Sequence, residues 1–561
     1  MINKQSIMSM LERCKSMREV KQVHSLMITS SLITQTIRLS KLIDSCVHPH
    51  SGDLQHALSI FVRLHSPSLY IWNSMLRAFS TSQQPQTTLS FYKDLQRSGL
   101  SPDHFTFPFA LKVCAEMPDR TTGRCIHARV VKGGYEHDVY VNVALMRMYA
   151  CCGDVVCAKS LFDADGDPNV VAWTTMIAGY VDSGRAREAI SLFKEMEAEE
   201  ITPNEITMVH LLAACAQTRD LETGAWIHAR LKCSKTQPIR YNVVLATALV
   251  DMYARCGSLR AAREVFDEMR ERNEVTWNVM ISGYNQYGRS EDVWGMYRGM
   301  CGSGLRPDKV TLLSLLGVCG NKGALSLGQG VHGYVEKTAG GGSRDVEVGT
   351  SLMDMYTKSG DTESAVRVFN GLKSRGDVVA WTSMIMGLAR NGDGKKALEM
   401  FEEMNERGVR PDGITFIGVM SACSHAGMVD EGRKWFDSMR DVYGVRPEVE
   451  HYGCIVDLLS RAGRLQEAEG LVRAMPMEPS MQIWGSILSG CESHGEVEVA
   501  ERIGCQLAEF DPGGSGVYVL LSNVYAGAGR WLGVERSRKL MWRRGVKKNQ
   551  GMSSLEVKGS W

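Results

Sequence analysis

The stretch EVTWNVMISGYNQYGRSEDVWGMYRGMCGSGLRPD (residues 274–308) contains two helical patterns separated by a glycine. In the first half, apolar residues recur at helical spacing up to Gly288, a residue type that commonly caps the C-terminus of a helix. Ser290 is expected to be the N-cap of the second helix, which again ends at glycine. The stretch therefore predicts a pair of antiparallel helices spanning 35 residues.

Two signatures from this hairpin recur four times along the 561 residues. Trp-Asn or Trp-Thr begins at Trp72, Trp173, Trp277 and Trp381, and Pro-Asp or Pro-Asn follows 30 residues after each Trp. The copies stand 101 or 104 residues apart, and two further hairpins fill each period. Because a two-helix unit cannot bury its inner face alone, such a repeat indicates a stacked array. We therefore predict an all-α superhelix with a concave groove.

The composition limits the kinds of function that this array can have. Hydrophobic residues make up 44% of the chain, enough for a continuous core, and no run of about 18 apolar residues predicts a membrane span. The net charge of +1 excludes a strongly basic nucleic-acid coat. If the chain binds nucleic acid, contacts with bases must therefore carry much of the affinity, because counterion release cannot dominate.

Cysteine and histidine recur with the repeat, but their placement argues against a metal site. None of the 16 cysteines forms a Cys-x-x-Cys pair. Four of them lie at matching places in apolar runs and are expected to be core residues in a reducing compartment: Cys114, Cys215, Cys319 and Cys423. Three histidines lie one period apart and cannot converge on one ion: His127, His228 and His332. We expect packing or hydrogen bonding within the hairpin for these histidines, and no metal or cofactor.

The 35-residue unit resembles the plant pentatricopeptide repeat, and the alternation of three unit types resembles its PLS subclass. The phrases DVVAWTSMIMGLARNGDGKKALEMFEEMNERGVRPD (377–412) and EHYGCIVDLLSRAGRLQEAEGLVRAMPMEPS (450–480) carry this resemblance. It implies a right-handed superhelical solenoid of stacked helix-turn-helix repeats. It also implies degenerate L/S-type repeats over 1–68, two E-type motifs over 481–550 and a short tail over 551–561. The expected units are P 69–103, L 104–138, S 139–169, P 170–204, L 205–242, S 243–273, P 274–308, L 309–345, S 346–377, P 378–412, L 413–448 and S 449–480.

The variable residues after each Trp and Pro are the candidate base-binding positions. Repeats of this kind read single-stranded RNA one base per unit with two or three side chains. In the family's usual code, Thr or Ser in the first place favours purines and Asn favours pyrimidines. Asp in the second place favours U or G, and Asn there favours C or A. Carried over to this chain, the code gives Asn73/Asp103 for U, Thr174/Asn204 for A, Thr247/Asn273 for A, Asn278/Asp308 for U, Thr350/Asp377 for G and Thr382/Asp412 for G.

Other positions in these units are expected not to discriminate between bases. The L-type units place Pro108, Val209, Leu313 and Ile417 at the first reading position, and two S-type units place Val143 and Gly453 there. A base could be sandwiched by flanking apolar residues such as Val170 or Val378. There is also a second interpretation of Asp or Asn after Pro, since these residues are common at turns and as N-caps. That interpretation does not explain the recurrent polar residue after each Trp.

The resemblance favours a site-recognition factor for C-to-U editing of organellar transcripts, acting as a monomer without a membrane anchor. In this family the array lies parallel to RNA, with the last S-type unit four nucleotides before the edited C. The expected element is 5′-U-N-N-A-N-A-U-N-G-G-N-N-N-N-N-C. The implied partners are a deaminase-bearing pentatricopeptide protein of the DYW type, acting in trans, and multiple organellar RNA editing factors. A mitochondrial location is preferred to a plastid one on family habit alone.

The chain itself is expected to be non-catalytic. His494-Gly495-Glu496 matches half of the zinc deaminase signature, but no Pro-Cys-x-x-Cys follows. The segment 530–548 carries eight basic residues against Glu535 alone. It is read either as a solvated end of the solenoid or as a surface for RNA or the deaminase. Two other functions remain open: RNA stabilisation, splicing or translation without editing, and a peptide-binding helical scaffold.

Overall fold

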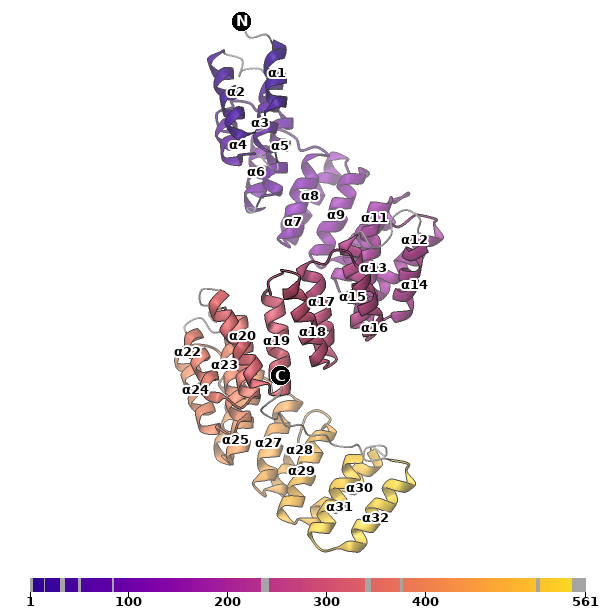
Figure 1. The fold of residues 1–561 in the computed structure, drawn as a ribbon, viewed down its shortest axis with the longest axis vertical. Helices are drawn as coiled ribbons and strands as arrows, with labels where there is room; N and C mark the ends of the chain where they lie inside the picture. Colours follow the sequence, from indigo (N-terminus) through magenta and orange to yellow (C-terminus); the bar gives the residue numbers. More distant parts are fainter. Residues whose placement is uncertain are drawn as a thin grey trace. The chain divides into compact units, whose positions relative to one another are not determined.

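A computed structural model describes residues 4–14, 16–30, 36–48, 52–82, 85–233, 242–338, 345–373, 377–510 and 515–546. These residues form 32 helices and no strand, so the expected all-α fold is confirmed (Figure 1). The predicted tail 551–561 lies outside the described residues. No helix of the described chain is long and apolar enough to cross a membrane.

The helices divide between two compact units, residues 1–283 and 284–561, and each unit is described by itself. The first contains α1 (Lys4–Arg13), α2 (Met17–Thr29), α3 (Thr36–Cys46), α4 (Leu54–Phe61), α5 (Leu69–Ser80), α6 (Pro85–Arg97), α7 (Thr106–Glu116), α8 (Arg120–Gly133), α9 (Val139–Cys151), α10 (Val155–Asp163), α11 (Val170–Asp182), α12 (Ala186–Ala198), α13 (Glu205–Thr218), α14 (Leu221–Cys233), α15 (Val243–Arg255) and α16 (Leu259–Glu268). The division falls within α17 (Glu274–Gln286). The second contains α18 (Ser290–Gly302), α19 (Lys309–Lys322), α20 (Leu325–Thr338), α21 (Val346–Lys358), α22 (Thr362–Leu372), α23 (Val378–Arg390), α24 (Gly394–Glu406), α25 (Gly413–Ala426), α26 (Val429–Asp441), α27 (Val449–Arg461), α28 (Leu465–Arg473), α29 (Met481–His494), α30 (Val497–Phe510), α31 (Ser515–Gly527) and α32 (Trp531–Arg543).

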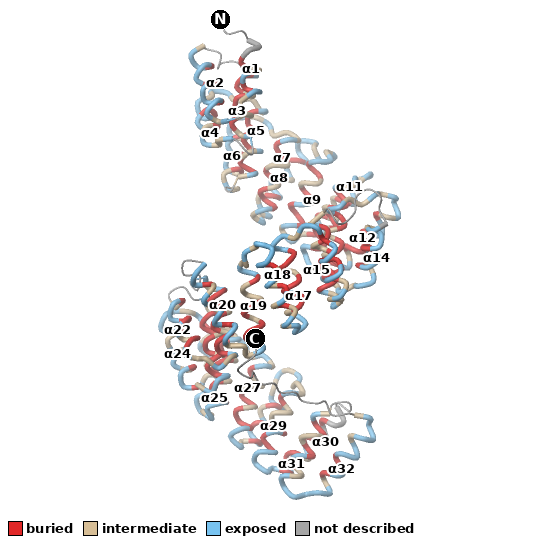
Figure 2. The backbone as a smooth tube through the Cα atoms, in the orientation of Figure 1, coloured by how far each residue is buried: buried red, intermediate tan, exposed pale blue. Residues whose placement is uncertain are grey.

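Within each unit the helices pair into hairpins, and the first helices of successive hairpins pack side by side. In the first unit α7, α9, α11, α13 and α15 each contact the next helix of this series, and α19 to α31 do the same in the second unit. Buried residues recur along these stacked helices (Figure 2). The predicted stacking of two-helix units is therefore confirmed within each unit.

The two helices of the quoted stretch form almost as its sequence predicts. Gly288 has φ +67° after α17, in the left-handed region that favours glycine at a helix end. The second helix differs in one detail, because Ser290 is its first helical residue and Arg289 is the N-cap. The Ser290 hydroxyl instead donates back to the carbonyl of Gly288. The expectation that Ser290 caps this helix is thus wrong by one residue.

Each repeated tryptophan joins its hairpin to the preceding one. All four are buried, and each stacks edge to face on a phenylalanine at the end of the previous hairpin. The pairs and their ring-centroid separations are Phe61–Trp72 (4.6 Å), Phe162–Trp173 (4.8 Å), Phe266–Trp277 (4.8 Å) and Phe369–Trp381 (4.7 Å). Edge-to-face pairs contribute about 0.5–1.5 kcal/mol beyond the area they bury. The Trp signature therefore marks a junction between hairpins.

The four recurrent cysteines are core residues, as expected. Cys114, Cys215, Cys319 and Cys423 are fully buried. Burial raises the pKa of Cys423 to about 12 and that of Cys319 to about 11, because an apolar interior disfavours the thiolate. These thiols consequently behave as small hydrophobic side chains.

Candidate functional site

The six predicted base-binding pairs occupy equivalent places in the repeat. The first member of every pair is the fifth residue of a first helix: Asn73, Thr174, Thr247, Asn278, Thr350 and Thr382. Five second members lie directly before the next first helix, namely Asn204, Asn273, Asp308, Asp377 and Asp412, and Asp103 lies three residues before the start of α7. In the five pairs whose members lie in one compact unit, side-by-side packing of first helices can therefore bring the two members together.

The second member of each pair caps the helix that follows it. In Asn204 and Asp412, for example, Oδ1 accepts hydrogen bonds from the backbone N–H of Thr207 (2.9 Å) and Thr415 (2.8 Å). The alternative interpretation of these residues as N-caps is therefore confirmed. Both bonds end on Oδ1, which leaves the other terminal atom of the side chain outside the cap. In Asp this atom is a hydrogen-bond acceptor, whereas in Asn it is a donor.

A buried threonine links the two members in three of the Thr-containing pairs. It stands three residues after the capping Asp or Asn, and its hydroxyl meets both the cap and the Thr of the preceding first helix. The contacts to the helix Thr are Thr174–Thr207 (2.7 Å), Thr247–Thr276 (2.8 Å) and Thr382–Thr415 (2.7 Å). The contacts to the cap Oδ1 are Thr207–Asn204 (3.0 Å), Thr276–Asn273 (2.8 Å) and Thr415–Asp412 (2.8 Å). We call these threonines the bridging threonines.

The pair Asn73/Asp103 meets both directly and through a bridging threonine. Asn73 Nδ2 donates to Asp103 Oδ1 at 3.0 Å, and Thr106 Oγ1 lies 2.7 Å from Oδ1 of each residue. Burial would raise the pKa of Asp103, but the hydrogen bonds from Thr106, Asn73 and Phe105 outweigh it and lower the pKa. The carboxylate is therefore held in its ionised, hydrogen-bond-accepting form.

The pair Thr350/Asp377 lacks a bridging threonine, and the two members of the pair Asn278/Asp308 lie in different compact units. Ala380 takes the place of the bridging threonine after Asp377, so the Thr350 hydroxyl donates only to the carbonyl of Val346, at 2.7 Å, and Asp377 accepts only a backbone bond. Because the division between the compact units falls between Asn278 and Asp308, each of these two residues is described within its own compact unit. Asn278 is buried, and Asp308 caps α19 with Thr311 at the bridging position.

An exposed apolar residue accompanies almost every reading position, three residues before it. In the first compact unit this row comprises Tyr70, Phe105, Tyr140, Val171, Ile206, Val244 and Val275, and in the second it comprises Val310, Val379 and Ile414, with 49–78% of each residue exposed. Single exposed apolar residues are ordinary, but a periodic row is typical of a binding surface. The predicted base-sandwiching residues Val170 and Val378 are less exposed than the row. In each helix the next residue, Val171 or Val379, belongs to the row.

The first helices α21 and α27 have glutamate at this place instead, at Glu347 and Glu450. Glu347 forms an ion pair with Lys309 at 2.5 Å, and Lys309 also lies 3.1 Å from the carboxylate of Asp345. The six apolar or glycine residues at first reading positions, which were expected not to discriminate, are all partly exposed: Pro108, Val143, Val209, Leu313, Ile417 and Gly453. None of these side chains carries a hydrogen-bonding group.

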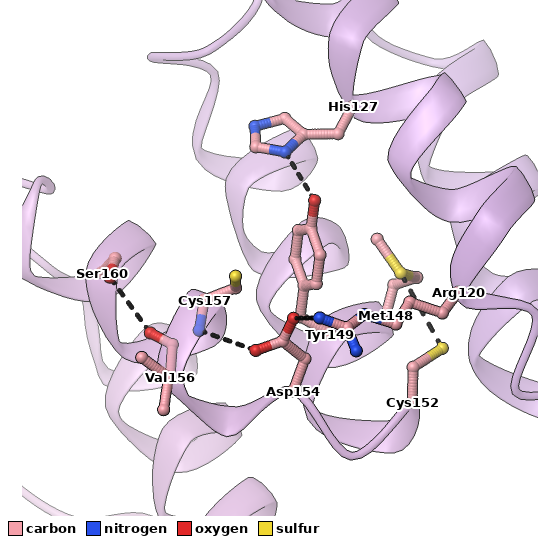
Figure 3. A network of polar contacts seen from close by, with 9 residues as sticks. All are labelled: Arg120, His127, Met148, Tyr149, Cys152, Asp154, Val156, Cys157 and Ser160. Carbon is pink, nitrogen blue, oxygen red and sulfur yellow. Dashed lines mark hydrogen bonds and ion pairs between the residues drawn. The ribbon is translucent and has the colours of Figure 1, made fainter.

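The recurrent histidines bind a tyrosine of the following hairpin. His127 Nδ1 lies 2.8 Å from Tyr149 Oη (Figure 3), and the equivalent pairs His228–Tyr253 and His332–Tyr356 are 2.9 Å apart. The expectation of a bond within one hairpin is therefore wrong, because these bonds join the second helix of one hairpin to the first helix of the next. No cluster of three potential metal ligands occurs among the described residues.

The C-terminal helix α32 exposes both aromatic and basic residues. Trp531 and Trp542 are 70% and 82% exposed, and Leu532 is 84% exposed. One of its basic residues, Lys539, pairs with Glu535 at 2.5 Å. Earlier in the chain, His494 ends α29, and its Nε2 lies 3.0 Å from the carbonyl of Arg461. The partial zinc signature thus contributes a contact between neighbouring helices.

Comparison with known proteins gives one consistent result. The PPR repeat family matches residues 168–217, 272–321 and 377–425, the PPR repeat matches 70–100, 244–274, 350–377, 414–442 and 450–478, and the E motif matches 494–556. The putative pentatricopeptide repeat-containing protein At3g05240 of Arabidopsis thaliana is 46% identical over 98% of both chains. From the same plant, the mitochondrial protein At2g22410 is 36% identical over 99% of this chain and 85% of its own length. The chloroplastic protein At1g08070 is 37% identical over 98% and 78%.

Solved structures agree on the fold. The pentatricopeptide repeat protein PPR10 in complex with an 18-nt psaJ RNA element superposes with a TM-score of 0.57 at 18% identity. That match covers 91% of this chain and 80% of PPR10. PPR10 from maize alone gives a TM-score of 0.55 at 16% identity, over 97% and 89% of the two chains.

Proposed function

The chain belongs to the pentatricopeptide repeat family, and from this premise we propose that it binds single-stranded RNA base by base along its first helices. The observation that carries the proposal is the repeated reading pair, a helix Asn or Thr joined to a capping Asp or Asn. The structurally similar PPR10 is described in complex with an RNA element, which supports the same class of ligand. The exposed apolar row supplies surfaces against which bases can stack or pack.

Hydrogen-bond chemistry supports the proposed base at each bridged pair. The Thr382 hydroxyl and the outward oxygen of Asp412 both accept, and the edge of guanine offers two neighbouring donors, N1–H and the N2 amino group. With Asn204 in place of Asp, the outward atom donates, which suits adenine N1 beside its N6 amino group. Asn73 retains a free amide proton beside the Asp103 acceptor, which suits a carbonyl and N3–H of uracil.

These assignments give the ligand a sequence. The proposed element is 5′-U-N-N-A-N-A-U-N-G-G-N-N-N-N-N-C. Six of the unassigned bases lie under the four L-type units and the two S-type units without a polar reader, and the three before the final C lie beyond the last S-type unit. The net charge of +1 supports a contribution from bases larger than that from phosphates, so the affinity should depend weakly on salt.

The proposed biological role is site recognition for C-to-U editing of an organellar transcript. The matched E motif, the family resemblance and relatives described as mitochondrial or chloroplastic support it. In this role the final C of the element is edited by a deaminase supplied in trans. A mitochondrial location is proposed ahead of a plastid one.

Binding of the purified full-length chain to synthetic RNA tests the first part of the proposal. Replacing one assigned base, such as the A under Thr174/Asn204, should weaken binding several-fold to about tenfold, the value of one hydrogen bond of about 1 kcal/mol. Replacing an unassigned base under an L-type unit is the matched control and should change little. Equal affinity for all sequences would refute sequence-specific reading, and no binding would favour a protein-binding scaffold.

Sequencing of organellar transcripts from a loss-of-function line tests the second part. One or a few cytidines preceded by the element should remain unedited. Normal editing at every site, together with reduced abundance, splicing or translation of one transcript, would replace the editing role with an RNA-processing role. In that outcome the base assignments would still apply to the affected transcript.

A further inference from the structure

The hydroxyl of the bridging threonine Thr415 has one proton and three polar neighbours, which determine the direction of every hydrogen bond around it. At Thr415, the Asp412 carboxylate can only accept and the Asp412 backbone N–H can only donate, at 2.8 and 3.2 Å respectively. The Thr415 proton therefore points to the carboxylate, and its oxygen accepts. The remaining neighbour, the Thr382 hydroxyl at 2.7 Å, must then donate its only proton to Thr415.

The consequence reaches the surface that faces the ligand. Thr382 has no proton left for an RNA base and can present only lone pairs. The Thr174 hydroxyl is constrained in the same way, because its proton can go to Thr207 or to the Val170 carbonyl, each 2.7 Å away. A hydroxyl that would otherwise either donate or accept is thereby restricted to accepting, which distinguishes an amino group from a carbonyl on a base.

We propose that the bridging threonines Thr207, Thr276 and Thr415 are positioning residues that set the hydrogen-bond direction of the Thr-containing reading pairs and thereby their base selectivity. This inference rests on the proposed RNA-binding function and deepens it. The bridging threonine adds a third, buried residue to each two-residue reader. All three are completely buried, so they act on RNA only through their neighbours.

The chain contains its own comparison. At the pair Thr350/Asp377 the bridging position is Ala380, and no side chain joins the two readers. The Thr350 proton is held by the Val346 carbonyl alone, so it can turn towards a base at the cost of one hydrogen bond. This unit should therefore prefer G less strongly than the neighbouring pair Thr382/Asp412, although both carry the same Thr and Asp.

The test measures binding of the full-length chain to four RNAs that differ only at the base under Thr382/Asp412. Thr415→Val keeps the shape and burial of the side chain but removes the hydroxyl, and it should reduce the G-to-A affinity ratio about five- to tenfold, as expected for one hydrogen bond. Thr415→Ser retains the hydroxyl and should preserve the ratio. The ratio at the base under Thr174/Asn204 is the internal control and should not change in either variant.

Two further variants keep the inference falsifiable if Thr415→Val does not fold. Thr207→Val should reduce the A-to-G ratio at the base under Thr174/Asn204, and Ala380→Thr should increase the G-to-A ratio under Thr350/Asp377. Unchanged ratios in valine variants that still bind RNA would overturn the role of the bridge and leave the proposed function intact. Loss of affinity by the same factor for all four bases would also overturn it, because that result indicates only a structural role. An unaltered chain that binds no RNA would overturn both proposals.

Discussion

The capping residue of a reading pair can be exchanged with little cost to the fold, and the exchange should change the base that is read. Asp412→Asn retains Oδ1, which accepts from the backbone N–H and the hydroxyl of Thr415, both at 2.8 Å. Asn204 already makes the equivalent bonds with Thr207 at 2.9 and 3.0 Å. Because Asn and Asp are nearly equal as N-caps, we expect a change of a few tenths of a kcal/mol in stability.

The outward atom changes from an acceptor to a donor. It then opposes N1–H of guanine and matches N1 of adenine, so about 1 kcal/mol is lost for one base and gained for the other. The G-to-A affinity ratio should fall by about 2 kcal/mol, or roughly 30-fold. The ratio is the proper readout, since removal of one negative charge also tightens binding of every RNA to a similar extent.

Fluorescence anisotropy with four labelled RNAs, each carrying a different base under this pair, measures the ratio directly. Asn204→Asp is the reciprocal control and should convert a preference for A into a preference for G at its own base. Thermal unfolding of both variants should match that of the unaltered chain. If Asp412→Asn changed the affinity for all four RNAs by one common factor, the outward atom of the cap would not be the reader.

Three other predictions concern the surface, the core and the contacts between hairpins. Glu347→Val should strengthen RNA binding about twofold, because it removes a carboxylate that is paired with Lys309 from the otherwise apolar row, and the gain in affinity should disappear at high salt. An unchanged affinity would contradict a role of this row in RNA binding. Cys423→Ser should lower the free energy of unfolding by about 1–3 kcal/mol, because it buries an unpaired hydroxyl. Denaturant unfolding measures this change against the apolar control Cys423→Ala, and equal stability of the two variants would contradict the prediction. Burial and nearby Lys232 lower the pKa of His228 below its usual 6.5, so below pH 6.5 the unfolded chain binds more protons than the folded chain and stability should fall. The double variant His228→Phe, Tyr253→Leu should remove this part of the pH dependence, and a pH profile identical to that of the unaltered chain would refute the prediction.

The fold was largely predictable because its signals are local and repeated. Helical spacing and glycine ends specify each hairpin, and the period specifies that hairpins stack. What the sequence did not indicate was how the hairpins contact one another. The pairing of His228 with Tyr253 joins residues from different hairpins, and only packing brings them to 2.9 Å. The N-cap of α18 is Arg289 and not Ser290, a difference of one residue that sequence patterns do not resolve because they locate helix ends only approximately.

Family resemblance predicted the residues of the proposed reading pairs, but two structural features that accompany them were not predicted. The exposed row escaped notice because first helices are apolar on several faces, so Val171 cannot be distinguished from its neighbour Val170 by pattern. The bridging threonine did leave a signal. Each Pro-Asp or Pro-Asn is followed three residues later by threonine, at Thr106, Thr207, Thr311 and Thr415. That spacing is typical of a side chain that bonds back to its N-cap.

The capping role and the reading role of the second residue are therefore not competing interpretations. A cap requires one acceptor atom directed at the start of the next helix, and a reader requires a second polar atom directed away from it. Serine and threonine satisfy the first requirement but have a single oxygen, whereas Asp and Asn satisfy both. In the proposed role, the two-atom ends of Asp103 and Asn204 would let one residue both cap a helix and contact a base. Because the cap fixes Oδ1, the outward atom is either the second oxygen of Asp or the amide nitrogen of Asn. In the proposed role, an outward oxygen would select a base that donates a hydrogen bond at that position, and an outward nitrogen would select a base that accepts one.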